Sequence, residues 1–136
     1  MTTILGRDAI LQNNSFKQRE VTVAELGGVL LVRELSGLHA AEFQRRSMAL
    51  VDTQKTQIRD AKELAELSAQ VWVWGVIDKD GQALFTREDI PRITGMPARI
   101  VDLVADAILD LSGLSQRALR RAKKNSMTPA NDSGTD

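Results

Sequence analysis

The sequence predicts an α+β fold, a mostly α-helical single domain with an N-terminal β-hairpin and a disordered C-terminal tail. Alternating apolar residues on both sides of a glycine pair, within residues 19–33, are typical of a hairpin. Apolar residues at helical spacing recur through most of the later segments. Residues 125–136 hold Pro, Gly, Ser, Asn and Asp and little that packs, so the domain is expected to span 1–124 and the tail 125–136.

Composition limits the classes of function. The 136 residues include no cysteine, which excludes disulfides, zinc–thiolate sites and thiol nucleophiles. The 18 acidic and 18 basic residues balance, so bulk charge favours neither nucleic acid nor a membrane surface. The first residues lack a signal-peptide pattern, and the longest apolar run, Val71–Ile77, is too short to span a bilayer. We therefore expect a soluble, cytosolic protein.

The N-terminal residues predict a short helix followed by a hairpin. The helix is expected at 4–12 and is ended by the polar residues 13–17. Residues 19–25 alternate like a strand, and Gly27-Gly28 allow the positive φ that a tight turn needs. Residues 29–33 return as a second strand, which is apolar enough to be covered on both faces.

A helix is expected from Ser36, whose side chain can cap the first turn, to about Val51. Its buried positions are expected to include Leu38, Ala41, Phe43 and Met48. Residues 52–57 are polar and leave two interpretations open, a loop or a continuation of the helix.

The segment that contains both tryptophans is ambiguous. From Ile58 onward the apolar residues fall at helical spacing, whereas Trp72 and Trp74 alternate with valines as in a strand. We favour a helix that buries its last two turns through 71–77, and the pattern leaves a strand open. Core packing is the first interpretation of both tryptophans, and an exposed one would be an anchor for a partner.

The segment Asp78-Lys-Asp-Gly81 predicts a turn. An EF-hand loop needs glycine at its sixth position, whereas a loop that starts at Asp78 has glycine at its fourth, so calcium binding is disfavoured. Thr86 with Asp89 three residues later is a near capping box, which predicts a short helix at 87–93.

The clearest helix is expected at 97–111, opened by Pro97 and ended by Ser112-Gly113. Its apolar stripe consists of Ile100, Val101, Val104, Ala107, Ile108 and Leu111. An acidic stripe recurs at every fourth residue of the same helix, at Asp102, Asp106 and Asp110.

A last helix is expected at 115–124, and it is strongly basic. Its bases are Arg117, Arg120, Arg121, Lys123 and Lys124. Three interpretations stay open: a solvated helix end favoured by the helix dipole, contact with an acidic protein surface such as the stripe of residues 102, 106 and 110, and nucleic-acid binding. Nucleic acid is the least favoured, because the net charge is zero and no known nucleic-acid-binding module surrounds the segment.

The sequence contains no recognisable catalytic or metal-binding motif. His39 is the only histidine and no cysteine accompanies it, so neither a transition-metal cluster nor a catalytic triad is indicated. The pair Gly27-Gly28 lacks the other residues of a phosphate-binding loop. We therefore expect a non-enzymatic protein without a cofactor, and His39 is expected at the surface or half-buried.

Three phrases in a fixed order resemble a known family. Val-Arg-Glu-Leu-Ser-Gly at 32–37 ends the hairpin and starts a helix, and Ile-Asp-Lys-Asp-Gly-Gln-Ala-Leu-Phe-Thr at 77–86 forms the turn. Leu-Ser-Gly-Leu-Ser at 111–115 then leads to a helix that ends Ala-Lys-Lys-Asn-Ser at 122–126. Over roughly residues 5–126, this order resembles the tail assembly chaperones of long-tailed, non-contractile phages and prophages.

The resemblance implies a protein of the host cell cytoplasm that binds the tape measure protein, keeps that long helical chain soluble and helps recruit tail tube subunits. It implies absence from the mature virion, and the shorter of two forms related by a programmed ribosomal frameshift. Self-association is a further expectation, with neither nucleic acid nor membrane as a partner. The residues expected to bind partners are Trp72, Trp74, Arg117, Arg120, Arg121, Lys123 and Lys124.

Two other classes of function compete with this interpretation. One is a structural virion component, such as a head–tail connector or minor tail protein, which would be found in purified particles. The other is a small nucleic-acid-binding regulator that uses the basic segment 117–124.

Overall fold

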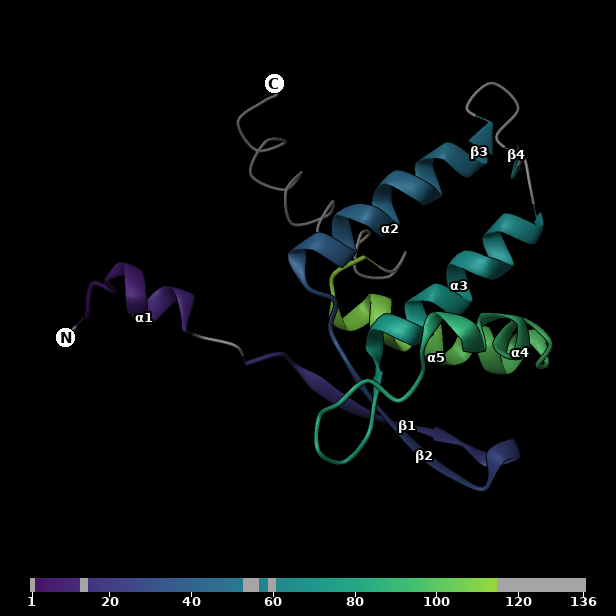
Figure 1. The fold of residues 1–136 in the computed structure, drawn as a ribbon, viewed down its shortest axis with the longest axis horizontal. Helices are drawn as coiled ribbons and strands as arrows, with labels where there is room; N and C mark the ends of the chain where they lie inside the picture. The colour runs from purple at the N-terminus through teal and green to yellow at the C-terminus, as the bar shows by residue number, and fades with distance from the viewer. Residues whose placement is uncertain (1, 13–14, 53–56, 59–60, 115–136) are drawn as a thin grey trace, which may run out of the picture.

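The computed structural model describes residues 2–12, 15–52, 57–58 and 61–114. The predicted α+β fold is confirmed (Figure 1). In chain order the elements are α1 (Arg7–Leu11), β1 (Gln18–Val23), the 3-10 helix η1 (Ala24–Leu26), β2 (Gly28–Arg33), α2 (Gly37–Leu50), β3 (Val51–Asp52), β4 (Gln57–Ile58), α3 (Ala61–Gly75), β5 (Val76–Ile77), the 3-10 helix η2 (Arg87–Asp89), α4 (Ile90–Thr94) and α5 (Ala98–Leu111).

A three-stranded antiparallel sheet has the strand order β1-β2-β5, and its hairpin lies below the helices in the view of Figure 1. The predicted hairpin is confirmed, with Gly27 at φ 78° in the turn. The expectation that β2 is covered on both faces is wrong, because Val29 is 56% exposed. Helix α5 packs on β1 and β2, and the buried residues Val21 and Val32 lie on one face of the hairpin.

The tryptophan segment contains both structures that the sequence left open. Helix α3 runs through Trp72 and Trp74 to Gly75, and Val76–Ile77 then pairs with β2 as strand β5. The helix begins at Ala61 and not at Ile58, because Ile58 belongs to β4, which pairs with β3. The described ends of segment 52–57 therefore pair as short strands and do not continue α2.

The turn after β5 forms as the sequence predicts. Asp78 Oδ1 accepts hydrogen bonds from the backbone N–H groups of Asp80 and Gln82 at 2.8 and 3.0 Å, and Gly81 has φ 85°. The capping box of Thr86 and Asp89 is present and starts η2, from which α4 continues.

Helix α5 forms the centre of the hydrophobic core. Pro97 precedes its first turn, and its predicted stripe faces α3 and the sheet. Four members of the stripe are buried and two are half-buried: Ile100, Val101, Val104 and Ile108, then Ala107 and Leu111. After Ser112, Gly113 takes φ 76° and Leu114 N donates to Leu109 O at 2.7 Å, which confirms the predicted helix end.

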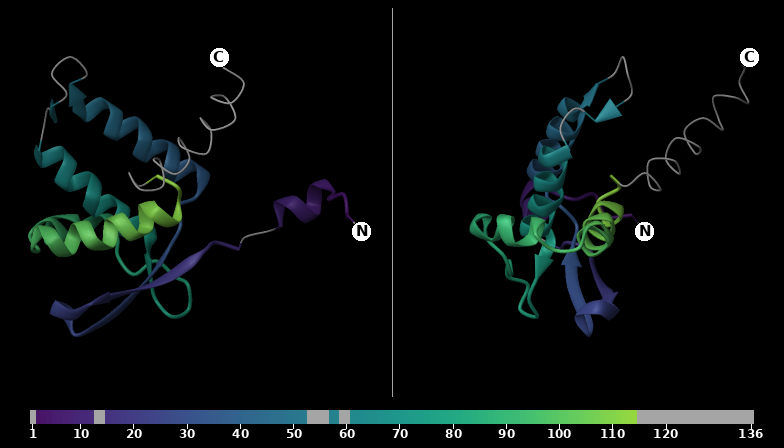
Figure 2. Two further views of the ribbon diagram at one scale, coloured as in Figure 1. Left: turned by 180° about the vertical axis from the view of Figure 1, so that it is seen from behind. Right: turned by 90° about the vertical axis from the view of Figure 1, so that its right-hand side faces the viewer.

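The N-terminal helix α1 forms within the predicted range and stands clear of the other elements in both Figure 1 and the left view of Figure 2. The predicted basic helix at 115–124 and the predicted tail at 125–136 lie outside the described residues. The domain boundary after residue 124 therefore stays a prediction.

Candidate functional site

Helix α2 is the least covered long helix among the described residues. Ser36 caps it as predicted, because its Oγ accepts from His39 N at 3.2 Å and its carbonyl accepts from Ala40 N at 2.8 Å. The expected buried positions are wrong: Leu38 is 78% exposed, Met48 is 75% exposed and Ala41 is exposed as well. Only Phe43 of that set is half-buried, because just one side of α2 meets α3.

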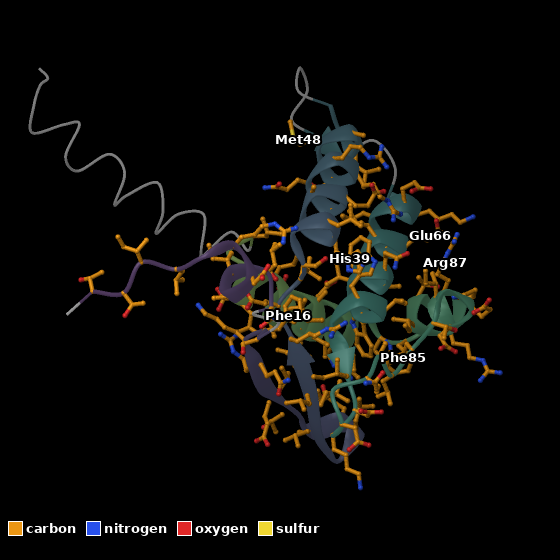
Figure 3. All side chains as sticks on the ribbon, turned by 60° about the vertical axis from the view of Figure 1, so that its left-hand side comes forward. Phe16, His39, Met48, Glu66, Phe85 and Arg87 are labelled. Carbon is orange, nitrogen blue, oxygen red and sulfur yellow. The ribbon has the colours of Figure 1, made fainter. Side chains whose placement is uncertain are left out.

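The exposed apolar residues of α2 lie on the side that faces away from α3. We call Leu38, Ala41 and Met48 the α2 outer face. Figure 3 shows His39 between α2 and α3, and Met48 near the far end of α2. Large exposed apolar side chains grouped on one helix face are typical of surfaces that bind another protein.

Among the described residues, few side-chain contacts hold α2 to the rest of the fold. The imidazole of His39 stacks on the indole of Trp74, with ring centroids 4.6 Å apart and planes 12° apart. Arg46 lies 3.9 Å from Glu63 of α3, and the side chains of Ala40 and Phe43 pack against the core. The helix is therefore attached along one edge.

An apolar groove of about 390 Å³ lies beside α2, and we call it the α2 groove. It is lined by Phe43, Gln44, Ser47, Met48 and Leu114. Leu114 reaches α2 because Ser112 Oγ accepts from Leu35 N at 2.8 Å, which ties the end of α5 to the residue before the Ser36 cap. Among the described residues that line the groove, none is acidic or basic.

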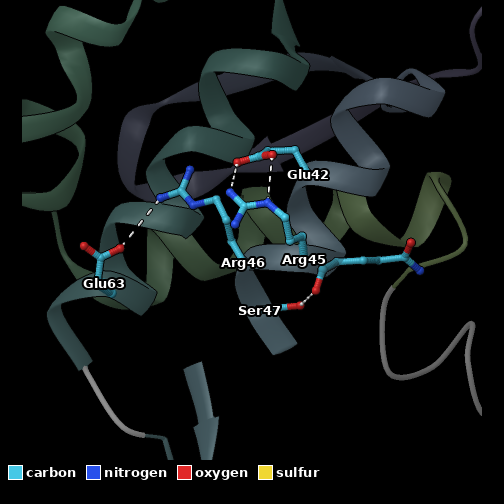
Figure 4. Close-up of polar contacts among 6 residues, drawn as sticks. Glu42, Arg45, Arg46, Ser47 and Glu63 are labelled. Atoms are coloured by element: carbon cyan, nitrogen blue, oxygen red, sulfur yellow. Dashed lines mark hydrogen bonds and ion pairs between the residues drawn. The ribbon is translucent and has the colours of Figure 1, made fainter. Parts of the chain in front are cut away.

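Charged residues of α2 form ion pairs with Glu42 of the same helix and with Glu63 of α3 (Figure 4). Arg45 binds both carboxylate oxygens of Glu42 at 2.7 and 3.3 Å, which lowers the pKa of Glu42 and raises that of Arg45. Ser47 Oγ donates to Gln44 O at 3.1 Å. The part of the groove that the described residues form consequently offers a partner apolar and neutral polar side chains.

The two tryptophans take different positions. Trp72 is 2% exposed and its indole N–H donates to Val101 O at 3.0 Å, so it lies in the core as the packing interpretation expected. Trp74 is half-buried under His39. Burial lowers the pKa of His39, and the nearby Arg33 lowers it further. The predicted partner-binding role of the tryptophans stays a prediction.

The acidic stripe of α5 is only in part available to a partner. Asp110 pairs with Arg19 of β1 at 3.2 Å, whereas Asp102 and Asp106 are exposed. Burial and the neighbouring Asp102 raise the pKa of Asp106. The basic residues expected to meet such a stripe lie outside the described residues: Arg117, Arg120, Arg121, Lys123 and Lys124. The structure does not test this contact.

Two other kinds of site can be judged in the described part of the chain, a metal site and a membrane-spanning helix. There, no group of three or more His, Asp or Glu side chains is placed to hold a metal ion. None of the helices described is both long enough and apolar enough to cross a membrane. The α2 outer face and the α2 groove are candidate surfaces for binding another protein.

Comparison with known proteins gives a likeness of fold. No protein-family model matches the sequence. No curated protein matches it either. The solved structure of the tail assembly chaperone of bacteriophage HK97 is similar, with a TM-score of 0.53 and 20% sequence identity. The match covers 71% of this chain and 85% of that chain, so the two proteins share most of one fold.

Proposed function

We propose that this chain is a non-enzymatic tail assembly chaperone of a long-tailed, non-contractile phage or prophage. It binds the tape measure protein, keeps it soluble in the host cell cytoplasm and helps recruit tail tube subunits, and it is absent from the mature virion. The likeness of fold to the HK97 tail assembly chaperone supports the proposal, together with the three sequence phrases that resemble the family.

The observation that carries the proposal is the α2 outer face. A chaperone for a long amphipathic helix needs an exposed apolar surface that is rigid enough to remain folded without its client. Leu38 and Met48 are each at least three-quarters exposed on a helix that Ser36 caps and that packs on the core through one side. Weak contacts of this kind gain strength when many copies bind along one extended client.

The test is co-expression of this chain with the tape measure protein of the same phage or prophage. We expect more soluble tape measure protein and its co-purification with this chain. The variant Leu38→Asp should reduce both several-fold, because it places a charge on the α2 outer face. An aspartate in the first turn of a helix favours the helix dipole, so the fold should be kept.

The matched control is Leu26→Asp, which adds the same charge at a residue that is 50% exposed at the tip of the hairpin. It should leave the rescue intact. A folded wild-type chain that neither solubilises the tape measure protein nor co-purifies with it would contradict the proposal. Mass spectrometry of purified phage particles distinguishes the chaperone from the alternative, a structural virion component, because only the latter would be found in the particles.

A further inference from the structure

Strand β1 forms one edge of the three-stranded sheet, and among the described strands that edge is open. The sheet has the order β1-β2-β5, so β1 pairs with β2 on one side and with no described strand on the other. The register with β2 is continuous along β1, without a bulge or a proline. Bulges and prolines are common means of keeping an edge strand from pairing with another chain, so this edge is suited to accept a further strand.

Three residues of β1 direct their backbone groups away from β2. Glu34 N donates to Lys17 O at 2.9 Å, which places the backbone groups of Lys17 on the β2 side. In an antiparallel strand the N–H and C=O of one residue point the same way, and the direction alternates along the chain. The outward N–H and C=O groups therefore belong to Gln18, Glu20 and Thr22, which are all exposed. We call these groups the β1 edge.

Two ion pairs attach α5 along β1. Asp110, near the end of α5, lies 3.2 Å from Arg19, near the start of β1. Arg99, in the first turn of α5, lies 2.9 Å from Glu25, which follows β1 directly. The helix therefore runs beside the strand in the opposite direction. A charge on an edge strand usually keeps other strands away, but α5 already holds the guanidinium of Arg19.

The side chains of α5 between the two ion pairs select the kind of partner. Leu103 and Asp106 follow Arg99 at helical spacing and lie on the same side of α5. Leu103 is 46% exposed. Partial burial and the neighbouring Asp102 raise the pKa of Asp106, and the second cause is a repulsion between two carboxylates. A basic side chain beside them would relieve this repulsion, whereas an acidic one would increase it.

A second copy of this chain fits the β1 edge less well than a basic strand does. If two β1 strands paired antiparallel through all their outward residues, the two copies of Glu20 would lie opposite each other. Like charges opposite each other destabilise a strand pair. The guanidinium of Arg19 is engaged by Asp110 in each copy. The charges near the edge therefore favour a strand from a different protein.

The basic segment 117–124 of this chain is a further competitor for the acidic side chains of α5. Its sequence, Arg-Ala-Leu-Arg-Arg-Ala-Lys-Lys, does not alternate between polar and apolar residues, so its pattern is not that of a strand. The β1 edge offers backbone hydrogen bonds that an extended segment uses and a helix does not.

We infer that the β1 edge binds an extended segment of another protein in which basic and apolar residues alternate. The segment adds a strand to the sheet by pairing with Gln18, Glu20 and Thr22, and its side chains meet Leu103 and Asp106 of α5. Backbone hydrogen bonds supply the affinity, and the side chains of α5 select the charge. The contact does not use α2, so it does not depend on the proposed chaperone function.

The test uses the full chain and a short synthetic peptide that alternates lysine and valine, with binding measured by isothermal titration calorimetry. We expect this peptide to bind several-fold more tightly than a peptide of the same length that alternates glutamate and valine. The lysine peptide with every backbone nitrogen methylated should bind several-fold more weakly, because it cannot donate to the strand. The variant Asp106→Asn should weaken binding of the lysine peptide and reduce its dependence on salt.

The variant Thr22→Pro tests the edge itself. It removes an outward N–H that does not bond to β2, and proline is tolerated at such a position of an edge strand. It should bind the lysine peptide several-fold more weakly than the wild type. The matched control, Thr22→Ala, removes the side chain and keeps the N–H, so it should bind as the wild type does.

A wild type that binds the lysine peptide no better than the glutamate peptide would overturn the inference, and so would unchanged binding of the methylated peptide. The latter result requires no change in the protein, so it holds even where Thr22→Pro does not fold. A lower sedimentation mass for Thr22→Pro than for Thr22→Ala would assign the edge to a second copy. Several-fold tighter binding by Arg120→Gln with Arg121→Gln would assign the acidic side chains to the basic segment of this chain, and either result would overturn the inference.

Discussion

Trp72 and Trp74 lie two positions apart, and the structure gives them different neighbours. Two residues along a helix differ by about 200° in direction, so they cannot face the same element. Trp72 points to α5, where its N–H bonds to Val101 O, and Trp74 meets His39 of α2. The sequence predicted packing for both residues, but spacing alone does not say which element covers which face.

The position of His39 makes the stability of the protein sensitive to pH, because burial and the nearby Arg33 lower the pKa of its imidazole. The pKa of His39 is lowered from its ordinary value of 6.5, so the unfolded chain binds more protons than the folded one. The contribution of neutral His39 to the free energy of unfolding is therefore complete above pH 6.5. It is lost as the pH falls toward the lowered pKa of His39. We expect the urea midpoint of unfolding to decrease between pH 7.5 and 5.5.

The variant His39→Gln serves as the control for this pH dependence. It removes the titrating imidazole, so the urea midpoint should change less over the same pH range. Ordinary pKa values of Asp and Glu lie near 4, below this range. The raised pKa of Asp106 would act in the opposite direction, because it lowers the stability as the pH rises. An equal decrease in the variant and the wild type would show that another group causes the effect.

Among the elements, α3 and α5 pack most tightly at Gly75. A Cβ at this position would lie 2.7 Å from both Cδ1 and Cγ2 of Ile108. Because Ile108 is fully buried, it has little room to move. We expect Gly75→Ala to reduce the free energy of unfolding by about 1–3 kcal/mol, measured by urea denaturation.

A double-mutant cycle tests the physical reason for that loss. In the background of Ile108→Ala the side chain that would clash is gone, so adding Gly75→Ala should cost much less than in the wild type. Additive costs would show that the loss comes from the backbone of Gly75 and not from the contact.

The two long helices α5 and α2 show how far periodicity predicts a fold. In α5 the apolar stripe is continuous and the predicted face is the buried one. In α2 the apolar residues are spread around the helix, so Leu38 and Met48 were assigned to a core that they do not reach. Periodicity indicates a helix in both cases, but only a tertiary partner decides what is buried.

At the scale of the whole molecule, Ser112 joins the N-terminal and C-terminal halves. Its Oγ accepts from Leu35 N and donates to Ile108 O, each at 2.8 Å. We expect Ser112→Ala to reduce the free energy of unfolding by about 1–2 kcal/mol. The reason is that the part-buried N–H of Leu35 loses its hydrogen-bond acceptor.

The control for this prediction is Ser47→Ala, which removes an exposed hydroxyl that bonds within its own helix. Its effect in the same urea experiment should be within about 0.5 kcal/mol, as for most surface substitutions. Similar losses in both variants would contradict the role given to Ser112.

The groove itself could not be predicted from the sequence. The residues of α2 that line it meet Leu114 where the hydrogen bond between Leu35 N and Ser112 Oγ brings two distant parts of the chain together. The hairpin, the Asp78 turn, the capping box and the end of α5 were all predicted, since each depends on residues a few positions apart.

The stack of Trp74 under His39 also provides an optical signal. The chain has no tyrosine, so its ultraviolet fluorescence comes from two indoles alone. With Trp72 replaced by phenylalanine, the remaining emission reports on the ring against which α2 rests. A protonated imidazole quenches a neighbouring indole, and movement of α2 would expose that indole to water. Among the long helices described, α2 alone has no buried residue. Its movement could therefore be followed by fluorescence without any added dye.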